Sequence, residues 1–207
     1  MGMFSAMEPE RSRGRFSLGE AAALAGVEEK AARHAVNDVL EKGVGTLGAR
    51  DVLFFALREA TREVCPTVAF QRALYRKLHE ANFRVLKSPA VEVEMETSRG
   101  GRGMTIRIET APIAKDILDR IRAFRAGARR VSRNIYVVSG TLVFKGTRIP
   151  VEMIGSWLKQ GVPPSEIYED WPYLTNVDLE FARIYVELNP PRGRPRKPLE
   201  IRYMSED

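Results

Sequence analysis

Apolar residues recur along most of this chain at helical spacing, so the pattern predicts a mainly helical protein. Residues 16–60 keep this spacing on both sides of Gly26, which predicts two helices joined by a turn and a third helix after them. The spacing resumes over residues 66–82, where the expected core positions are Val68, Ala69, Leu74 and Leu78.

A further amphipathic helix is predicted over residues 112–130. Its apolar stripe contains Ile113, Ile117, Ile121 and Phe124. The arginines outside the stripe are Arg120, Arg122, Arg125, Arg129 and Arg130. We interpret these arginines as a solvated face and Gly127 as the exit from the helix.

Strict alternation of apolar and polar residues predicts one β-hairpin in the middle of the chain. Residues 91–96 and 104–109 alternate in this way, and Glu94 is expected to face Arg107 across the two strands. Because two strands are marginally stable alone, we expect them to join a neighbouring sheet or a second subunit.

Residues 131–188 show a second combination of strand and helix signals. Two short apolar runs, 135–138 and 142–144, predict a small hairpin, and three short helices follow it. Pro150 suits the start of the first helix, because its missing N–H is unpaired at that position in any helix. Thr175 suits the N-cap of the third helix. The stretch therefore predicts a compact three-helix, helix-turn-helix-like module.

This stretch is similar to small bacterial domains of formally unknown function that look like antitoxins of VapB type. The matching positions are Gly140, Gly146-Thr147-Arg148-Ile149-Pro150-Val151, Gly161, Glu166-Ile167, Asp170, Pro172, Leu174-Thr175 and Asp178. The resemblance implies an interaction or regulatory module, often encoded beside a PIN-domain ribonuclease toxin. The central Gly-Thr-Arg-Ile-Pro segment also serves as a strand-to-helix turn, so a ligand or partner role for Arg148 stays open beside that interpretation.

The N-terminal block predicts a DNA-reading helix-turn-helix. Ser17 followed by Glu20 is a capping box, and Gly26 separates this first helix from a second one over residues 28–41. Lysine and arginine on such a helix reach guanine or phosphate, and asparagine pairs with adenine. A short wing is predicted over residues 42–48, which contain three glycines. The candidate DNA-binding residues are Ser17, Lys30, Arg33, His34, Asn37 and Lys42.

This block resembles the N-terminal winged helix of MerR-type regulators. The resemblance rests on Phe16-Ser17-Leu18-Gly19-Glu20-Ala21, Leu24, Gly26-Val27, Ala32-Arg33 and Asp51-Val52-Leu53. It departs from that family at His34-Ala35, where an aromatic pair is usual, and in the acidic residues of the second helix, which include Glu28 and Glu29. A helical hairpin used only for packing or dimerisation is therefore the competing interpretation.

The end of the chain is rich in proline and basic residues. The Arg-Gly-Arg-Pro core is similar to an AT-hook, whose extended backbone lies in the narrow minor groove of DNA. The resemblance to VapB-type antitoxins implies instead an arginine that enters the acidic, Mg²⁺-binding pocket of the PIN ribonuclease. A solvated linker to residues 199–207 is the third possibility. The residues concerned are Arg192, Arg194, Arg196 and Lys197.

Composition narrows the classes of function. A net charge of +6 and a pI near 9.6 favour a polyanionic partner. Cys65 is the only cysteine, which excludes an internal disulfide and a thiolate metal cluster. The two histidines, His34 and His79, have no evident acidic or nucleophilic partner in the pattern, so we predict no catalysis, no cofactor and no metal. No membrane span or signal peptide is visible, which predicts a cytoplasmic protein.

Together these patterns predict an α+β fold that is mainly α with short β-hairpins. Its predicted parts are a flexible basic arm (1–15), a MerR-like winged helix-turn-helix with following helices (16–82), a β-hairpin and amphipathic helix (83–130), an antitoxin-type module (131–188) and a basic tail (189–207). The predicted function is a type II antitoxin that inhibits a PIN-domain ribonuclease toxin and represses its own operon. Operators normally hold two half-sites, which predicts a homodimer or larger even assembly. A stand-alone transcriptional regulator and an interaction scaffold are the alternatives.

Overall fold

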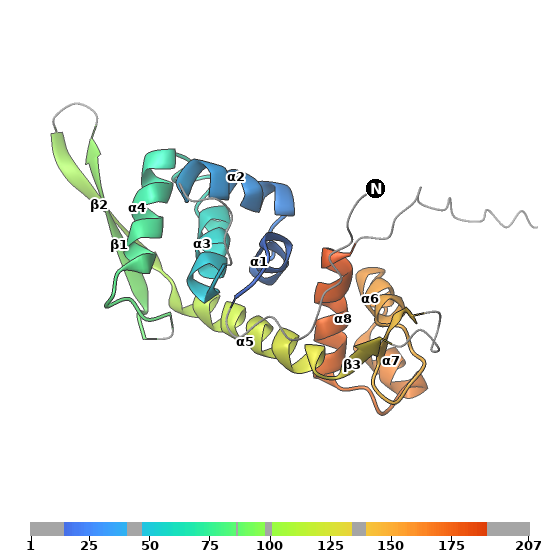
Figure 1. The fold of residues 1–207 in the computed structure, drawn as a ribbon. Coiled ribbons are helices and arrows are strands. Elements are labelled where there is room, and N and C mark those ends of the chain that lie inside the picture. Colours follow the sequence, from blue (N-terminus) through green and yellow to red (C-terminus); the bar gives the residue numbers. More distant parts are fainter. Residues whose placement is uncertain (1–14, 41–46, 86, 98–100, 134–139, 190–207) are drawn as a thin grey trace, which may run out of the picture.

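The computed structural model describes residues 15–40, 47–85, 87–97, 101–133 and 140–189 (Figure 1). In chain order the elements are α1 (Leu18–Ala25), α2 (Glu29–Val39), α3 (Ala49–Ala60), α4 (Val68–His79), β1 (Ala90–Thr97), β2 (Gly101–Glu109), α5 (Ala111–Ala128), β3 (Val131–Arg133), β4 (Leu142–Phe144), α6 (Val151–Lys159), α7 (Pro164–Asp170) and α8 (Asn176–Leu188). The predicted fold class, mainly α with short β-hairpins, is confirmed. Within these ranges no helix has the length and hydropathy needed to cross a membrane. The predicted arm, wing and tail fall wholly or largely at 1–14, 41–46 and 190–207, outside the described residues.

Helix α3 lies among the N-terminal helices and is largely buried. It contacts α1, α4 and α5, and five of its apolar residues are buried: Val52, Leu53, Phe54, Phe55 and Leu57. The sequence pattern predicts Ala56 in this core, but Ala56 is half-buried. Phe54 and Phe55 fill the additional faces, because a helix packed by three neighbours needs apolar side chains around most of its circumference.

Helix α4 buries a different face from the one predicted. Leu74 and Leu78 are buried as expected, but Phe70 and Gln71 replace Val68 and Ala69, and Val68 is 41% exposed. Phe70, Leu74 and Leu78 lie four residues apart and share one face of the helix, while Val68 and Ala69 of the first turn face solvent. Thr67 caps this turn by accepting a hydrogen bond from the Phe70 amide at 3.3 Å.

The central hairpin has the predicted alternation but a different register. Residue 107 of β2 faces residue 92 of β1, so Arg107 lies 3.5 Å from Glu92 and 3.0 Å from Glu109, and the predicted pair with Glu94 is wrong. The apolar face of β1, with Val91 and Val93 buried, packs on α4. A helix therefore covers the hairpin, and no third strand joins it among the described residues.

Helix α5 joins the N-terminal helices to the C-terminal module. It runs along the lower side of the molecule in Figure 1, from the hairpin to α8, and it packs against α1, α3 and α8. Its buried residues are Ala114, Ile117, Ile121, Phe124 and Gly127. Most of the predicted stripe is thus confirmed, although Ile113 is only half-buried.

The crossing of α5 with α8 requires a glycine. A Cβ built on Gly127 would overlap Phe181 of α8, and the Phe181 ring stacks on Phe124 with centroids 5.6 Å apart. Gly127 is therefore a buried packing position one residue before the end of α5, close to the predicted exit from the helix. The C-terminal module rests directly on α5.

The C-terminal module contains the three predicted helices and one wrongly placed strand. β4 pairs antiparallel with β3, so Leu142 faces Arg133 rather than a residue of the predicted run 135–138. Residues 134–139 lie outside the described ranges. α6 and α8 pack closely, since a Cβ on Gly155 would overlap the Ala182 carbonyl oxygen. The starts of all three helices, including the Thr175 N-cap, are as predicted.

Candidate nucleic-acid interface

Local hydrogen bonds build the turn that presents α2. The Ser17 hydroxyl accepts a hydrogen bond from the Glu20 amide at 3.3 Å, and the Ser17 amide donates to Glu20 Oε2 at 2.7 Å, which is the predicted capping box. Gly26 has φ 70, and its amide donates to the Ala23 carbonyl at 3.1 Å. Glycine adopts this left-handed conformation without the penalty a side chain incurs. The helix–glycine turn–helix is therefore confirmed as local structure.

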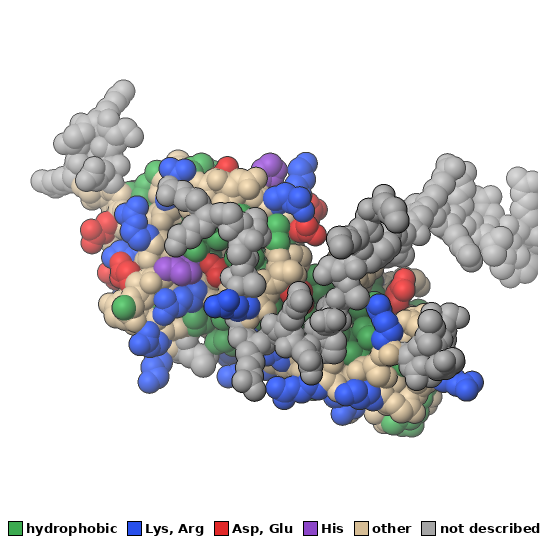
Figure 2. All heavy atoms as spheres, in the orientation of Figure 1, with side chains coloured by type: hydrophobic (Ala, Val, Ile, Leu, Met, Phe, Trp, Pro, Cys, Tyr) green, Lys and Arg blue, Asp and Glu red, His purple; other side chains and the backbone are tan. Residues whose placement is uncertain are grey.

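The outer face of α2 carries four of the predicted DNA-binding residues. They are Lys30, Arg33, His34 and Asn37, and all four are exposed. The opposite face is buried through Ala32, Ala35, Val36 and Val39. Figure 2 shows Lys/Arg and Asp/Glu side chains close to one another on the part of the surface where Figure 1 shows α2. The acidic side chains partly neutralise the basic ones on this face, because Arg33 Nη2 lies only 2.6 Å from Glu29 Oε1.

The other two predicted DNA-binding residues differ from these four. The Ser17 hydroxyl already holds the start of α1, so its evident role is to cap the helix. Lys42 lies outside the described residues. The outer face of α2 is therefore the part of the predicted site that the structure brings together.

Side chains from α3 and α4 donate hydrogen bonds to backbone carbonyl groups of α2. Arg58 Nη1 donates to the Ala31 carbonyl at 3.4 Å, and its Nε donates to Gln71 Oε1 at 2.9 Å. Arg72 is exposed, and it donates from Nε to the Asp38 carbonyl at 3.0 Å, near the C-terminal end of α2. These contacts hold the orientation of α2, and no sequence signal indicated them.

A polar cluster joins the start of α3 to α4. Asp51 Oδ2 accepts from the Gly48 amide at 2.7 Å, and Asp51 Oδ1 lies 3.2 Å from the Tyr75 hydroxyl and 3.3 Å from His79 Nε2. Burial raises the pKa of Asp51, but the contacts with His79 and the Gly48 amide outweigh it and leave the pKa lowered. Burial and the nearby Asp51 charge raise the pKa of Tyr75 to about 12. The expectation that His79 has no acidic partner is therefore wrong.

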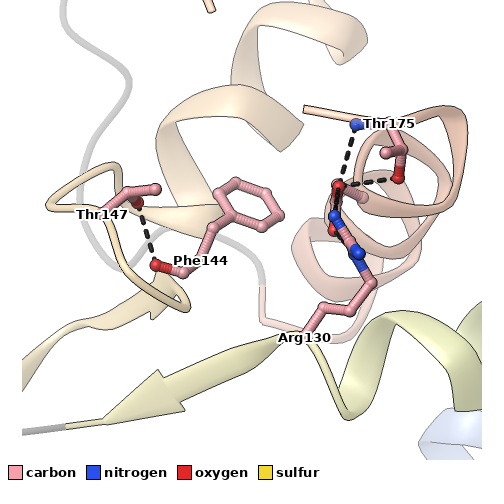
Figure 3. Close-up of polar contacts among 5 residues, drawn as sticks. Arg130, Phe144, Thr147 and Thr175 are labelled. Atoms are coloured by element: carbon pink, nitrogen blue, oxygen red, sulfur yellow. Dashed lines mark hydrogen bonds and ion pairs between the residues drawn. The ribbon is translucent and has the colours of Figure 1, made fainter. Parts of the chain in front are cut away.

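The Gly-Thr-Arg-Ile-Pro segment of the C-terminal module forms a tight turn (Figure 3). Thr147 Oγ1 donates to the Phe144 carbonyl at 2.9 Å and accepts from the Ile149 amide at 3.1 Å. Gly146 has φ 77, and Pro150 forms a β-bridge with Val143 before α6 begins. The strand-to-helix interpretation of this motif is confirmed.

Arg148 follows Thr147 in the same turn, and its side chain is exposed. The turn thus presents this arginine at the surface. A ligand or partner role for Arg148 remains a prediction.

An ion pair ties the end of α5 to the start of α8 (Figure 3). Arg130 Nε and Nη2 donate to the two carboxylate oxygens of Asp178 at 2.7 and 2.8 Å. Asp178 also accepts from the Thr175 amide and hydroxyl at 2.8 and 2.7 Å. Burial raises the pKa of Asp178, but Arg130 and Thr175 outweigh burial and lower it. Arg130 is therefore exposed to solvent, as predicted, and also bound to Asp178, a contact that the sequence pattern did not indicate.

Two more arginines of α5 point toward α1 rather than only to solvent. Arg120 Nη2 donates to the Ala23 carbonyl at 2.8 Å and lies 3.7 Å from Glu187 of α8. The Arg125 guanidinium lies over the Phe16 ring, 5.3 Å from its centroid. Burial raises the pKa of Glu187, although the Arg120 charge opposes this shift. These residues connect α1, α5 and α8.

A surface hollow lies beside the hairpin, apart from α2. Its volume is ≈ 370 Å³, and the lining residues come from the end of α4, the loop that follows it, β1 and β2. Its charges are largely matched in pairs, with Lys77 3.1 Å from Glu80 and Arg107 3.5 Å from Glu92. This pairing leaves little net charge for an ionic ligand.

Comparison with known proteins matches one region of the chain to a protein family. Residues 131–186 match the family described as "Protein of unknown function (DUF433)". An uncharacterised protein of Sinorhizobium fredii (strain NBRC 101917 / NGR234) is 31% identical over 91 residues, which are 44% of this chain and 41% of that protein. The chain thus matches less than half the length of this relative. No solved structure matches it.

Proposed function

We propose that this chain is a DNA-binding antitoxin. It contacts operator DNA through the outer face of α2, silences a PIN-domain ribonuclease toxin and represses its own operon. The observation that carries the DNA-binding part is the exposed polar face of α2, which a capped α1 and the Gly26 turn present to solvent.

The residues on this face fit major-groove recognition. Lys30, Arg33, His34 and Asn37 follow one another at i, i+3, i+4 and i+7, so they share one side of the helix. The major groove admits an α-helix, where arginine and lysine pair with guanine and asparagine with adenine. A dimer or larger even assembly presents two such helices to two half-sites.

The toxin-binding part is supported by the C-terminal module. Residues 131–186 match an uncharacterised family. Their sequence motif resembles that of VapB-type antitoxins. The Arg148 side chain is exposed on this module, and the basic tail follows α8. Arginines bind carboxylate clusters through paired hydrogen bonds, which is the chemistry of an acidic nuclease pocket.

A co-expression experiment tests the proposal. The tagged chain is expressed with the ribonuclease encoded beside it, and the captured complex is assayed for RNase activity and for binding to the upstream DNA. We expect capture, inhibition of the ribonuclease, and DNA binding that weakens when Lys30 and Arg33 are changed to alanine. A captured ribonuclease that stays fully active contradicts the antitoxin role.

A stand-alone transcriptional regulator is the second candidate. It is favoured by the geometry of α1 and α2, which supports DNA reading without reference to a toxin. Operator binding by a chain that captures no ribonuclease identifies this function. Absence of salt-dependent DNA binding contradicts both functions, because phosphate contacts weaken steeply as salt rises.

A further inference from the structure

The positive charge of this chain is concentrated in one stretch, from the middle of α5 to the start of α6. Residues 120–151 contain eight basic and no acidic residues. The rest of the chain, with 25 basic and 27 acidic residues, is slightly negative. The net charge of +6 therefore comes from this stretch, which α2 does not include.

The fold brings four of these residues to one exposed surface, the basic strip, which consists of Arg122, Arg129, Arg133 and Lys145. Arg122 and Arg129 are seven positions apart on α5, so they share one side of the helix. β3 follows α5 directly, and Arg133 is its last residue. The Lys145 amide donates to the Arg130 carbonyl at 2.8 Å, which places Lys145 beside the junction of α5 and β3. Figure 2 shows Lys/Arg side chains along the lower edge of the molecule, where Figure 1 shows α5 and β3.

Most of the charge on the basic strip is not neutralised by neighbouring carboxylates. Arg122 is paired, with Nη1 2.8 Å from Asp119 Oδ1. In the part of the chain that the structure describes, no carboxylate forms an ion pair with Arg129, Arg133 or Lys145. A surface with several like charges creates a potential that attracts a polyanion. The basic strip is therefore suited to a polyanionic partner.

The dimensions and composition of the strip fit the backbone of a nucleic-acid duplex. Seven helical residues separate Arg122 from Arg129 by about 10 Å, and the four residues from Arg129 to Arg133 span up to about 13 Å. One strand of duplex DNA has a phosphate about every 3.4 Å along the axis, so the strip is long enough to face several phosphates. Single-stranded nucleic acid needs exposed aromatic rings for base stacking, but Phe124 and Phe144, the aromatic residues described in this stretch, are buried.

The basic strip lies apart from the outer face of α2. α5 packs against α1, α3 and α8, and Figure 1 shows α1 and α3 between α2 and α5. Because a helix with its side chains is about 10 Å wide, α2 and the strip cannot contact the same phosphates.

We infer that the basic strip binds the phosphate backbone of a second segment of duplex DNA, apart from the segment that α2 reads. Phosphates are alike in every sequence, so this contact adds affinity without sequence preference. It goes beyond the proposed function, in which α2 alone contacts the operator. With two separate surfaces, one chain holds two DNA segments together.

The first test measures how affinity for a duplex of random sequence falls with salt. The strip variant of the full-length chain has glutamine at Arg122, Arg129, Arg133 and Lys145. The charge-matched control has glutamine at four basic residues exposed elsewhere, which are Arg62, Arg76, Lys87 and Lys159. Arg148 stays unchanged in both, because its partner role is a separate prediction. Each phosphate contact contributes about 0.9 to the slope of log affinity against log salt, so we expect the slope to fall by about 3 to 4 for the strip variant and by less than about 1 for the control.

A bead assay tests for the second DNA segment. Beads that carry the upstream DNA retain a labelled duplex of random sequence when the protein binds both. We expect retention with the wild type and the control, and loss of retention with the strip variant, which still binds the beads through α2.

A strip variant with the wild-type slope and wild-type retention overturns the inference. Loss of ribonuclease capture in that same variant identifies an acidic protein as the partner of the strip instead. A wild type that binds the upstream DNA but retains no second duplex overturns the inference alone. A wild type that binds no DNA overturns the DNA-binding part of the proposed function as well.

Discussion

Gly127 and Gly155 set how closely α8 packs on α5 and α6. Gly155 leads to a prediction at the residue scale. A Cβ on Gly155 would overlap the Ala182 carbonyl oxygen and a Val186 methyl group. Because a helix backbone cannot move aside easily, we expect Gly155→Ala to destabilise the fold by about 1–3 kcal/mol. Urea unfolding of the full chain measures this change.

Gly19→Ala is the matched control, since Gly19 also lies inside a helix. Its added Cβ would have its nearest neighbours at 3.5 Å, which is ordinary contact. Alanine restricts the unfolded chain more than glycine, so Gly19→Ala is expected to be neutral or to stabilise by up to about 1 kcal/mol. Equal destabilisation by the two substitutions would contradict the close packing of α6 on α8.

Asp178 gives a second residue-scale prediction, on pH dependence. Its folded-state pKa is lowered below the ordinary value of 3.8, so its charge stabilises the fold at neutral pH, and this stabilisation is lost as the pH falls through the folded pKa. Because the Arg130 side chain is 48% exposed, we expect Asp178→Asn to cost about 1–2 kcal/mol at neutral pH.

Urea midpoints measured across the acid range check this prediction. The difference in urea midpoint between wild type and Asp178→Asn is expected to narrow below about pH 4, where the carboxylate of the unfolded chain becomes protonated first, and to close as the pH falls through the lowered folded-state pKa. The exposed Asp170→Asn change on α7 is the control. A difference in urea midpoint that stays constant to the lowest pH measured would show that Asp178 stabilises the fold without its charge.

Several of these residues could not be assigned from the sequence. Ser17, Gly26 and Thr175 act within three or four positions along the chain, so their cap and turn patterns were sufficient. Arg130 acts on a residue 48 positions away, and Gly127 faces Phe181 of another helix. An arginine or glycine on a helix leaves the same local pattern whether it faces solvent or a distant element.

At the scale of elements, α2 contains a charge pair that restrains Arg33, one of the residues that we propose to contact DNA. Arg33 Nη2 lies 2.6 Å from Glu29 Oε1. Glu29→Gln removes that negative charge and releases the guanidinium, so we expect tighter DNA binding and a salt slope steeper by about 0.9. Glu59→Gln is the matched control, because it releases Arg62 from a similar pair, at 3.4 Å, elsewhere on the molecule. An equal gain from both changes would mean that net charge, and not α2, governs binding.

The register in which the strands pair was harder to predict than the presence of the strands. The alternation over residues 91–96 established which side of the hairpin is apolar. Glu92 and Glu94 lie two residues apart on one face, so a shift of two positions leaves the pattern intact, and Arg107 pairs with Glu92. The strand at 131–133 was missed for a related reason, since three residues are too few to show a period.

At the scale of the whole molecule, the C-terminal module and the N-terminal helices share one core through α5. Phe124 stacks on Phe181 at 5.6 Å, Gly127 lies under the same ring, and Arg130 binds Asp178 at the edge of this contact. These contacts fix α8 relative to α5. The residues matched by the uncharacterised family therefore do not bury α8 by themselves.

This shared core predicts that the full chain unfolds in one transition. Both tryptophans, Trp157 and Trp171, lie in the C-terminal module with ring centroids 5.1 Å apart, so their fluorescence reports this module alone. Far-UV circular dichroism reports helices throughout the chain. Coincident urea transitions by the two probes are expected for a coupled unit. Phe181→Ala removes the central contact at a cost of about 3–5 kcal/mol, and the fluorescence transition is then expected to occur first. Separate transitions in the wild type would mean that α5 connects two independent domains.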